Sequence, residues 1–368
     1  MIRRAPIVLV GGFTVWGREE AFGIKYWGGP GRDIQEDLKA HGFPAVTAAP
    51  GPVSSNWDRA AEVYAQVRGG TVDYGAAHAQ RFGHARFGRT YPGLLPEGAA
   101  HFVGHSMGGQ TIRVLAHLLA EGSEEERRAT PEGLSPLFLG GQPGVLSLTT
   151  LATPHRGTTR ARNREALAGV ARRIFALAGG MGSPAVYDLK LDHWGIQRHP
   201  GESWKAYRKS ILANPLWTGT QDFSAWDLSP RGAWQLNDWV RLPARVHAFS
   251  WSCAKTRPGA GGYQVPAPRM NIFWRPGARF MGRPQEGYPV DPSWFRNDGV
   301  VNTASMAGPD REAVEPYDGV PPRPGLWNHM GLLDGWDHSE ILGMGPEHQD
   351  EVLPFYRALA GFLEGIQP

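Results

Sequence analysis

One serine lies at the centre of a pentapeptide, Gly104-His105-Ser106-Met107-Gly108, that joins two segments of different periodicity. The apolar run 99–103 before it predicts a buried strand, and apolar residues at helical spacing after it predict a helix over 107–122. A Gly-x-Ser-x-Gly turn between a strand and a helix holds a nucleophile at the tip of a sharp bend, where the glycines leave room. The pattern therefore predicts a hydrolase built around Ser106.

Strand-like and helix-like segments alternate along the 368 residues. Apolar runs predict strands over 6–10, 44–49, 101–104, 145–152 and 245–251, and helical patterns cover 31–41 and 107–122. Such alternation favours a mainly parallel sheet with helices on both faces. The long segments 50–98 and 255–297, rich in Gly, Pro and Trp, are interpreted as insertions packed on a single domain spanning 1–368.

Composition excludes several classes of protein. The net charge is only +3 with acids and bases intermixed, so we expect no nucleic-acid partner. No run reaches the eighteen apolar residues of a transmembrane helix, so no membrane span is expected. Cys253 is the only cysteine, which excludes an internal disulfide and leaves the compartment open. The N-terminal residues lack the pattern of a signal peptide, which fits an internal protein or a mature form.

A serine hydroxyl needs a base within hydrogen-bond reach, and that base needs an acid to orient it. In doubly wound hydrolases the three follow the order serine, acid, histidine. Three histidines follow residue 300, namely His329, His338 and His348. His338 precedes a short apolar stretch near the C-terminus, where the last loop of the sheet should fall, so we predict it as the base. A surface histidine is the alternative.

The acid is less tightly defined by the sequence. Asp298 lies in a loop, 297–301, that turns into an apolar segment, which suits a carboxylate held by backbone amides. Asp318, Asp334 and Asp337 are alternatives. Spacing favours Asp298.

Acyl transfer also needs backbone N–H groups that face the developing oxyanion. One is expected from Met107, which follows the nucleophile, and the other from Phe13, in the glycine-rich loop after the first strand. The alternative is that the glycines of this loop only form a turn.

The segment 50–98 carries Asp58, His78 and His84, a set of residue types that suits zinc. A closed tetrahedral site requires a fourth ligand. Spacing alone favours ordinary surface histidines over a metal site.

Three longer motifs lie in and around this segment. They are 56–60 (Asn-Trp-Asp-Arg-Ala), 70–79 (Gly-Thr-Val-Asp-Tyr-Gly-Ala-Ala-His-Ala) and 83–92 (Gly-His-Ala-Arg-Phe-Gly-Arg-Thr-Tyr-Pro). Together with Phe13 and 16–20 (Trp-Gly-Arg-Glu-Glu), they resemble the zinc-containing thermoalkalophilic bacterial lipases, which are relatives of the staphylococcal lipases. The resemblance runs over nearly the whole chain.

The resemblance implies an α/β-hydrolase fold with a zinc-bearing insertion, formed by 50–98 with 214–242. It implies the catalytic residues Ser106, Asp298 and His338, and the oxyanion-hole amides of Phe13 and Met107. It implies a structural zinc held by Asp58, His78, His84 and a fourth ligand after the Trp-Thr-x-Thr motif at 217–220. Gln221 follows that motif here, so we assign Asp222, with an apparent one-residue insertion.

The chain departs from the family pattern at three places. The oxyanion loop reads Gly11-Gly12-Phe13 in place of His-Gly-Phe, which keeps the backbone donor. The calcium site of the family would map to Glu340, Pro346 and Arg269, but Gly345 replaces its aspartate, so we expect no strong calcium binding. The helical lid, assigned to 158–183, is shorter, and an ordinary surface helix is an alternative.

The resemblance implies a secreted carboxylester hydrolase of the triacylglycerol lipase or esterase type, acting at a lipid–water interface; without it, a cytoplasmic location is the default. Alternatives with the same chemistry are a phospholipase and a polyester hydrolase. A lipid-binding protein without catalytic activity on a hydrolase fold is an alternative of another class.

Overall fold

The computed structural model describes residues 4–95, 97–162, 187–197, 199, 201–214, 216, 220–285 and 290–366. Its strands are β1 (Ile7–Val10), β2 (Ala45–Ala48), β3 (Gly70–Asp73), β4 (Phe87–Tyr91), β5 (Ala100–His105), β6 (Val145–Leu151), β7 (His247–Ala254), β8 (Thr256–Pro258), β9 (Gln264–Pro266), β10 (Val314–Pro316) and β11 (Trp327–Asp334). Its helices are α1 (Ile34–Ala40), α2 (Asn56–Arg68), α3 (Ala76–Phe82), α4 (Met107–Glu121), α5 (Glu124–Ala129), α7 (Trp204–Ala213), α9 (Ser224–Asp227), α10 (Pro230–Trp239), α11 (Arg275–Met281) and α12 (Val352–Glu364).

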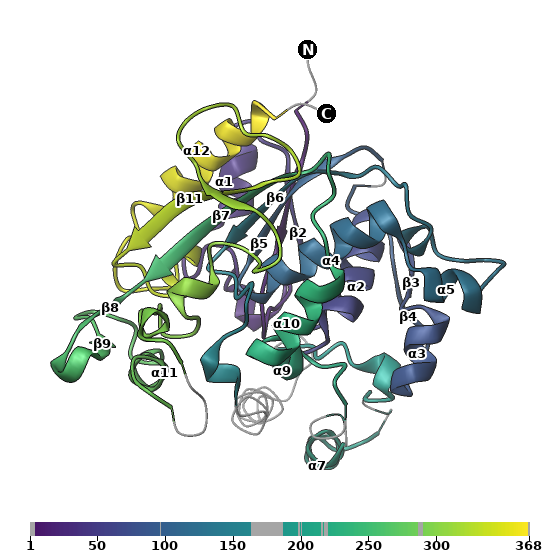
Figure 1. Ribbon diagram of the computed structural model, residues 1–368. Coiled ribbons are helices and arrows are strands. Elements are labelled where there is room, and N and C mark those ends of the chain that lie inside the picture. Colours follow the sequence, from purple (N-terminus) through teal and green to yellow (C-terminus); the bar gives the residue numbers. More distant parts are fainter. Residues whose placement is uncertain are drawn as a thin grey trace.

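Seven strands form one sheet in the order β10-β11-β7-β6-β5-β1-β2 (Figure 1). Every pairing within this sheet is parallel. The five strands expected from apolar runs are all present, as are the helices expected near 31–41 and 107–122. The prediction of a parallel α/β sheet is therefore confirmed.

Strand β1 shows how the sheet separates two cores. Because side chains alternate across a strand, Ile7 and Leu9 belong to the core beneath α1 and α12, whereas Val8 and Val10 belong to the core beneath α2 and α4. Figure 1 shows α12 beside α1, and it shows α2 beside α4 in a separate part of the molecule. A strand buried on both faces reads as a continuous apolar run, which explains why β1 was visible in the sequence.

The carboxyl ends of the parallel strands carry the loops that hold the predicted catalytic residues, as expected for an open α/β sheet. Ser106 directly follows β5, His338 follows β11, and Asp298 lies in the long connection between β7 and β10. Phe13 follows β1.

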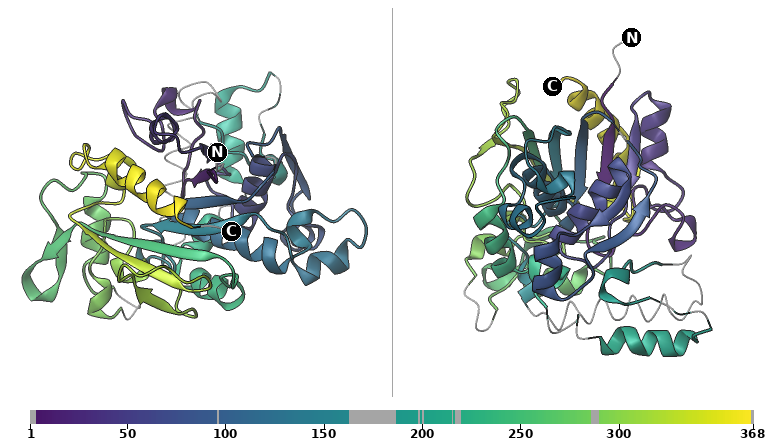
Figure 2. Two further views of the ribbon diagram at one scale, coloured as in Figure 1. Left: turned by 90° about the horizontal axis from the view of Figure 1, so that it is seen from above. Right: turned by 90° about the vertical axis from the view of Figure 1, so that its right-hand side faces the viewer.

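The two long segments contain regular structure of their own. Segment 50–98 contains α2, which packs against α4. It then contains β3, α3 and β4 in sequence order, and β3 pairs with β4. Segment 255–297 contains the antiparallel pair β8–β9 and α11. The right-hand view of Figure 2 shows α7 along the lower edge of the molecule, away from the sheet.

None of the helices in the described ranges combines the length and the apolar character needed to cross a lipid bilayer. The apolar face predicted for the lid, Leu167, Val170, Ile174 and Leu177, lies outside the described residues, which contain only 158–162 of the lid segment.

Candidate active site and metal centre

Ser106 occupies the sharp turn between β5 and α4. Its backbone has φ 55° and ψ −128°, a strained conformation for a residue with a side chain. The surrounding glycines permit this turn: a Cβ on Gly104 would lie 2.6 Å from the Gly108 backbone, and one on Gly108 would lie 2.2 Å from the Val10 carbonyl oxygen. The turn therefore presents the Ser106 hydroxyl at the carboxyl edge of the sheet, as a nucleophile elbow does.

The structure brings Ser106, His338 and Asp298 together from three loops. His338 Nε2 lies 2.9 Å from Ser106 Oγ, and His338 Nδ1 lies 2.7 Å from Asp298 Oδ2. Since the carboxylate can only accept, Nδ1 carries the proton and Nε2 is free to accept the hydroxyl proton of Ser106. This is the hydrogen-bond geometry of a serine nucleophile with its base and acid.

Asp298 is fully buried and held by its own loop. Its Oδ1 accepts the backbone N–H groups of Val300, at 2.9 Å, and Val301, at 2.7 Å. These bonds leave Oδ2 for the imidazole, as the sequence argument about backbone amides expected. Among the described residues, the alternative carboxylates have other partners. Asp334 pairs with Arg296, Asp318 accepts the backbone N–H of Val320, and Asp337 accepts those of Asn271 and Ser339.

The loop that carries the predicted oxyanion donor Phe13 lies close to the turn that carries Met107. A Cβ on Gly12 would lie 2.7 Å from the Cβ of Ser106 and 3.2 Å from the Met107 nitrogen, so the loop after β1 passes directly over the nucleophile elbow. Met107 begins α4, and the first N–H groups of a helix have no partner within it. The Phe13 N–H likewise donates to no group in the described part of the chain.

A cavity of about 310 Å³ opens beside Ser106. Most of its exposed surface is apolar, and the polar side chains that line it include Ser106, His338 and Arg160. The apolar lining includes Phe13, Trp16, Leu228, Trp274, Val300 and Met344. A pocket of this size and chemistry suits the acyl part of an ester.

Sequence reasoning missed a buried chain of hydrogen bonds behind the site. The Gly12 N–H donates to Tyr26 Oη at 2.9 Å, Tyr26 Oη lies 2.9 Å from His105 Nδ1, and His105 Nε2 lies 3.0 Å from the His338 carbonyl oxygen. The carbonyl can only accept, so His105 carries its proton on Nε2 and accepts the Tyr26 hydroxyl proton on Nδ1. Burial, and then the nearby His338, lower the pKa of His105 well below its ordinary value, so it stays neutral. This series of hydrogen bonds links the oxyanion loop, which carries Gly12 and Phe13, to the histidine loop, which carries His338.

Four predicted metal ligands converge in a second place. Asp58 is on α2, His78 is on α3, His84 follows α3, and Asp222 precedes α9. One donor atom from each lies within 4.8 Å of all the others, and these atoms are buried without a hydrogen-bond partner in the described structure. The four residues therefore form a group that can hold a metal ion.

Three of the separations within this group are close to those around a small tetrahedral ion, whereas His84 Nε2 lies 3.9 Å from Asp58 Oδ1. His78 Nε2 lies 3.2 Å from both Asp58 Oδ1 and Asp222 Oδ1, and His84 Nε2 lies 3.2 Å from Asp222 Oδ2. Ligands about 2.0–2.1 Å from a tetrahedral zinc would be about 3.3 Å apart. Burial disfavours charge on His78, but the two carboxylates raise its pKa to about 10, so the group attracts positive charge.

Further residues that the sequence did not reveal support the metal group from outside. His193 Nε2 lies 3.1 Å from Asp58 Oδ2, and His84 Nδ1 lies 2.9 Å from the Ala85 carbonyl, which leaves His84 Nε2 for the metal. The Glu126 carboxylate accepts the backbone N–H groups of Ala77 and His78, at 3.0 and 2.8 Å. His193 and Glu126 come from distant segments, so spacing could not identify them.

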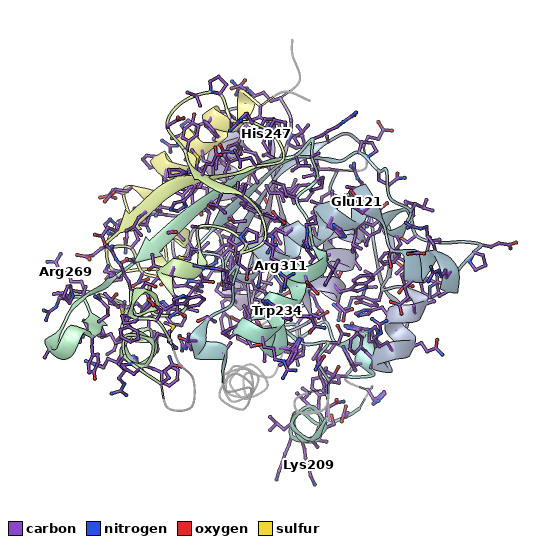
Figure 3. All side chains as sticks on the ribbon, in the orientation of Figure 1. Glu121, Lys209, Trp234, His247, Arg269 and Arg311 are labelled. Atoms are coloured by element: carbon purple, nitrogen blue, oxygen red, sulfur yellow. The ribbon has the colours of Figure 1, made fainter. Side chains whose placement is uncertain are left out.

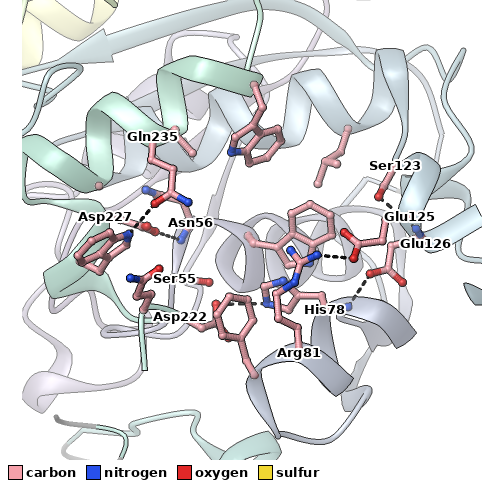
Figure 4. Close-up of a pocket in the computed structure, with 18 of the residues that line it drawn as sticks. Ser55, Asn56, His78, Arg81, Ser123, Glu125, Glu126, Asp222, Asp227 and Gln235 are labelled. Carbon is pink, nitrogen blue, oxygen red and sulfur yellow. Dashed lines mark hydrogen bonds and ion pairs between the residues drawn. The ribbon is translucent and has the colours of Figure 1, made fainter. Parts of the chain in front are cut away.

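A cavity of about 420 Å³, lined by both polar and apolar side chains, lies beside the metal group (Figure 4). The residues that line it include Asp222, His78, Arg81, Glu125 and Glu126. Arg81 pairs with Glu125. The cavity reaches the outer side of the metal ligands, while the Nε2 atom of His78 stays buried.

The residues that match the calcium site of the resembled family lie near His338. Glu340 is buried, whereas the side chain of Arg269 is 76% exposed and projects from the edge of the molecule near β8–β9 (Figure 3). Arg269 pairs with Glu347, at 3.1 Å.

Comparisons with known proteins agree with this fold. A family model described as the C-terminal domain of lipase-like proteins matches residues 3–365. The chain belongs to this lipase-like family. It is 34% identical to Lipase 2 of Staphylococcus aureus over 381 residues, covering 99% of this chain and 53% of that protein.

The chain also aligns with two solved structures over almost their whole length. Lipase 1 from Pelosinus fermentans is 44% identical with a TM-score of 0.88, covering 100% of both chains. Staphylococcus hyicus lipase is 32% identical with a TM-score of 0.87, covering 98% of this chain and 96% of that chain. The chain spans about half the length of the curated relatives it matches. The resemblance to the staphylococcal lipases and the α/β-hydrolase fold are both confirmed.

Proposed function

We propose that the protein is a carboxylester hydrolase that works through an acyl-enzyme on Ser106. The observation that carries this proposal is the unbroken contact from Ser106 Oγ to His338 Nε2 and from His338 Nδ1 to Asp298, at 2.9 and 2.7 Å. Membership of the lipase-like family and the apolar cavity beside Ser106 support the same reaction.

In the first half of the reaction, Ser106 Oγ attacks the ester carbonyl carbon and its proton passes to His338 Nε2. Asp298 holds the ring in this tautomer and stabilises the imidazolium that forms. The Phe13 and Met107 N–H groups receive the carbonyl oxygen as it becomes negative. The tetrahedral intermediate then collapses, and the leaving alcohol takes the proton from His338.

In the second half, His338 removes a proton from water, which attacks the acyl carbon. A second tetrahedral intermediate forms in the same oxyanion hole and collapses with return of the proton to Ser106 Oγ. The free acid leaves, and the enzyme is restored.

The cavity lining favours acyl esters with an apolar acyl group, such as triacylglycerols and simple esters. Phospholipids and polyesters remain alternatives that share the chemistry. Rates across esters of increasing chain length, beside a phospholipid and a polyester film, would rank these substrates.

Replacement of Ser106 by alanine tests the reaction. We expect Ser106→Ala to lose ester hydrolysis by a factor on the order of 10⁵ or more while its circular dichroism and metal content stay unchanged. Full turnover in this variant would exclude the mechanism. A protein that binds lipid without hydrolysing any ester would instead support the non-catalytic alternative.

We also propose that the metal group holds zinc in a structural role. Two imidazoles and two carboxylates at tetrahedral separations suit zinc, and four protein ligands leave no position for a reactive water. The ion would join α2, α3 and the segment before α9, which corresponds to the insertion 50–98 with 214–242. Metal analysis of protein purified without added metal tests this proposal.

The remaining proposals rest on the family resemblance. We propose that 158–183 includes a lid, as in the resembled family, and that the protein acts at lipid surfaces outside the cell. Activity measured below and above the solubility limit of a short triacylglycerol tests the first. Detection of the protein in the culture medium of its native host tests the second.

A further inference from the structure

Lys255 is a buried lysine beside the catalytic loops. It follows β7, and its side chain is only 2% exposed. Its Nζ lies 2.5 Å from Glu340 Oε1 and 2.8 Å from Glu347 Oε2. A buried ammonium is costly unless it is paired and hydrogen-bonded, and these two carboxylates supply that pairing.

The carboxylate of Glu340 is shared between Lys255 and the histidine loop. While Oε1 contacts Lys255, Oε2 accepts the backbone N–H of Asp337 at 2.7 Å. Asp337 immediately precedes His338. Glu340 is buried, and a buried carboxylate is costly unless it is paired and hydrogen-bonded, so the contact with Lys255 matters to the site.

The backbone of Lys255 meets the other catalytic loop. The Lys255 N–H donates to the Asn297 carbonyl at 3.0 Å, and Asn297 immediately precedes Asp298. One residue therefore contacts the acid loop through its backbone and the histidine loop through its side chain.

A calcium ion, which the family resemblance implies here, does not fit these residues. Calcium takes six to eight oxygen ligands, but Glu340 and Glu347 already meet the cations of Lys255 and Arg269. An aspartate cannot replace Gly345 in this arrangement, because a Cβ there would lie 2.0 Å from Glu340 Cγ. The side chain of Glu340, which pairs with Lys255, occupies the space that the Cβ of such an aspartate would need.

We infer that the Lys255 ammonium takes the place of a calcium ion in this chain, as a built-in cation that positions the His338 and Asp298 loops. Lys255 is a positioning residue that acts through Glu340 and touches no substrate. The protein then needs no calcium for stability or for the geometry of its catalytic residues. The kinetic part of this inference rests on the proposed function, whereas its stability and metal-binding parts do not.

The first experiment uses the wild-type protein, loaded with zinc and dialysed into calcium-free buffer. We expect CaCl₂ added to above about 1 mM, the weak end of protein calcium sites, to leave the Tm unchanged. Metal analysis should find no bound calcium. A calcium-dependent rise in Tm, or one calcium per chain, would overturn the inference.

The second experiment compares Lys255→Met with Lys255→Arg. Breaking a buried ion pair should lower the Tm of Lys255→Met by about 4–6 °C, and kcat for a soluble ester should fall with little change in KM. Arginine keeps the charge and should restore most of both losses. Calcium should raise the Tm of Lys255→Met only, because its carboxylates have lost their cation.

The matched control is Lys190→Met, a second largely buried lysine that donates to the Ala49 carbonyl at 2.6 Å, away from both catalytic loops. It should lose stability without any response to calcium. If Lys255→Met and Lys190→Met lose Tm and kcat equally, and neither responds to calcium, Lys255 has only a general structural role.

If Lys255→Met does not fold, the wild-type calcium titration still decides the question. A wild type without esterase activity would refute the proposed function but leave the Tm and metal measurements valid.

Discussion

Replacement of Tyr26 by phenylalanine tests the buried chain that links the oxyanion loop to His338. Burial raises the pKa of Tyr26 to about 12, so its hydroxyl is protonated at any assay pH and can donate to His105. The substitution removes that donor and the acceptor of the Gly12 N–H, but it keeps the ring that packs against Trp16, Trp27 and His105.

The size of the effect follows from the two groups left behind. The Gly12 N–H and His105 Nδ1 would stay buried without partners, and each such group costs about 1–3 kcal/mol, or about 2–6 kcal/mol together. Unfolding entropy near 2.1 cal/mol/K per residue gives about 0.8 kcal/mol/K for this chain, so the Tm should fall by about 3–7 °C. If about 1–2 kcal/mol of this loss is expressed in the transition state, kcat falls about 5- to 30-fold.

The assay is steady-state hydrolysis of a soluble p-nitrophenyl ester, with Tm measured on the same samples. Tyr356→Phe is the matched control, because Tyr356 is a buried tyrosine whose hydroxyl donates to the Ile341 carbonyl at 2.9 Å and contacts neither Gly12 nor His105. We expect Tyr26→Phe to lose kcat at nearly constant KM, and Tyr356→Phe to lose stability alone. Unchanged kcat in Tyr26→Phe, or equal kcat losses in both variants, would refute the positioning role of the chain.

Three further predictions concern the catalytic acid Asp298, the metal group and the buried His101. Asp298→Asn should lower kcat on the order of 10³- to 10⁴-fold with the fold intact, because the amide favours the wrong tautomer of His338; a loss below tenfold in ester hydrolysis would contradict the role of Asp298. Stripping the metal with dipicolinate should lower the Tm by about 5 °C, equivalent to ~4 kcal/mol for an ion at ~1,000 times its Kd, with recovery on adding zinc. Calorimetry of His84→Ala, which lacks one ligand, should show neither response. Burial, and then the charge of His247, lower the pKa of His101 to about 4 in the folded chain, against about 6.5 when unfolded. Below pH 6.5 the His101 imidazole binds a proton in the unfolded chain but stays neutral in the folded chain. The free energy of unfolding should therefore fall by about 3 kcal/mol between pH 6.5 and 4 from this residue alone. Urea unfolding of His101→Asn should show a smaller loss, and an identical pH dependence in wild type and variant would contradict the prediction.

The sequence predicted the sheet and the nucleophile elbow well because both depend on local pattern. A strand buried on both faces, such as β1 or β5, reads as an apolar run, and the glycines around Ser106 mark a turn that few other residues permit. Spacing favoured Asp298 over three other carboxylates, and it favoured surface histidines over a metal site. The family resemblance implied the same acid and assigned His78 and His84 to a metal site. In the structure, Asp298 lies beside His338, and the two histidines lie beside Asp58 and Asp222.

Residues that act through tertiary contacts gave no signal in the sequence. Tyr26 reaches His105 across 79 positions, His193 reaches Asp58 across 135, and Lys255 reaches Glu340 across 85. Each belongs to a residue type found in many roles, and only the packing of the loops around the carboxyl edge of the sheet selects its partner. The long segment that contains α2 was also hard to interpret, because its glycines and aromatics obscure a helix that packs against α4.

Reaction with a p-nitrophenyl alkylphosphonate, followed by intact-protein and peptide mass spectrometry, tests the central claim most directly. Transfer of the phosphonyl group to an activated serine releases p-nitrophenol and leaves a stable adduct. We predict one adduct per chain, located on Ser106, absent in Ser106→Ala and formed far more slowly in His338→Ala. An adduct on another residue, or continued ester hydrolysis by fully labelled protein, would contradict a nucleophile at Ser106 activated by His338.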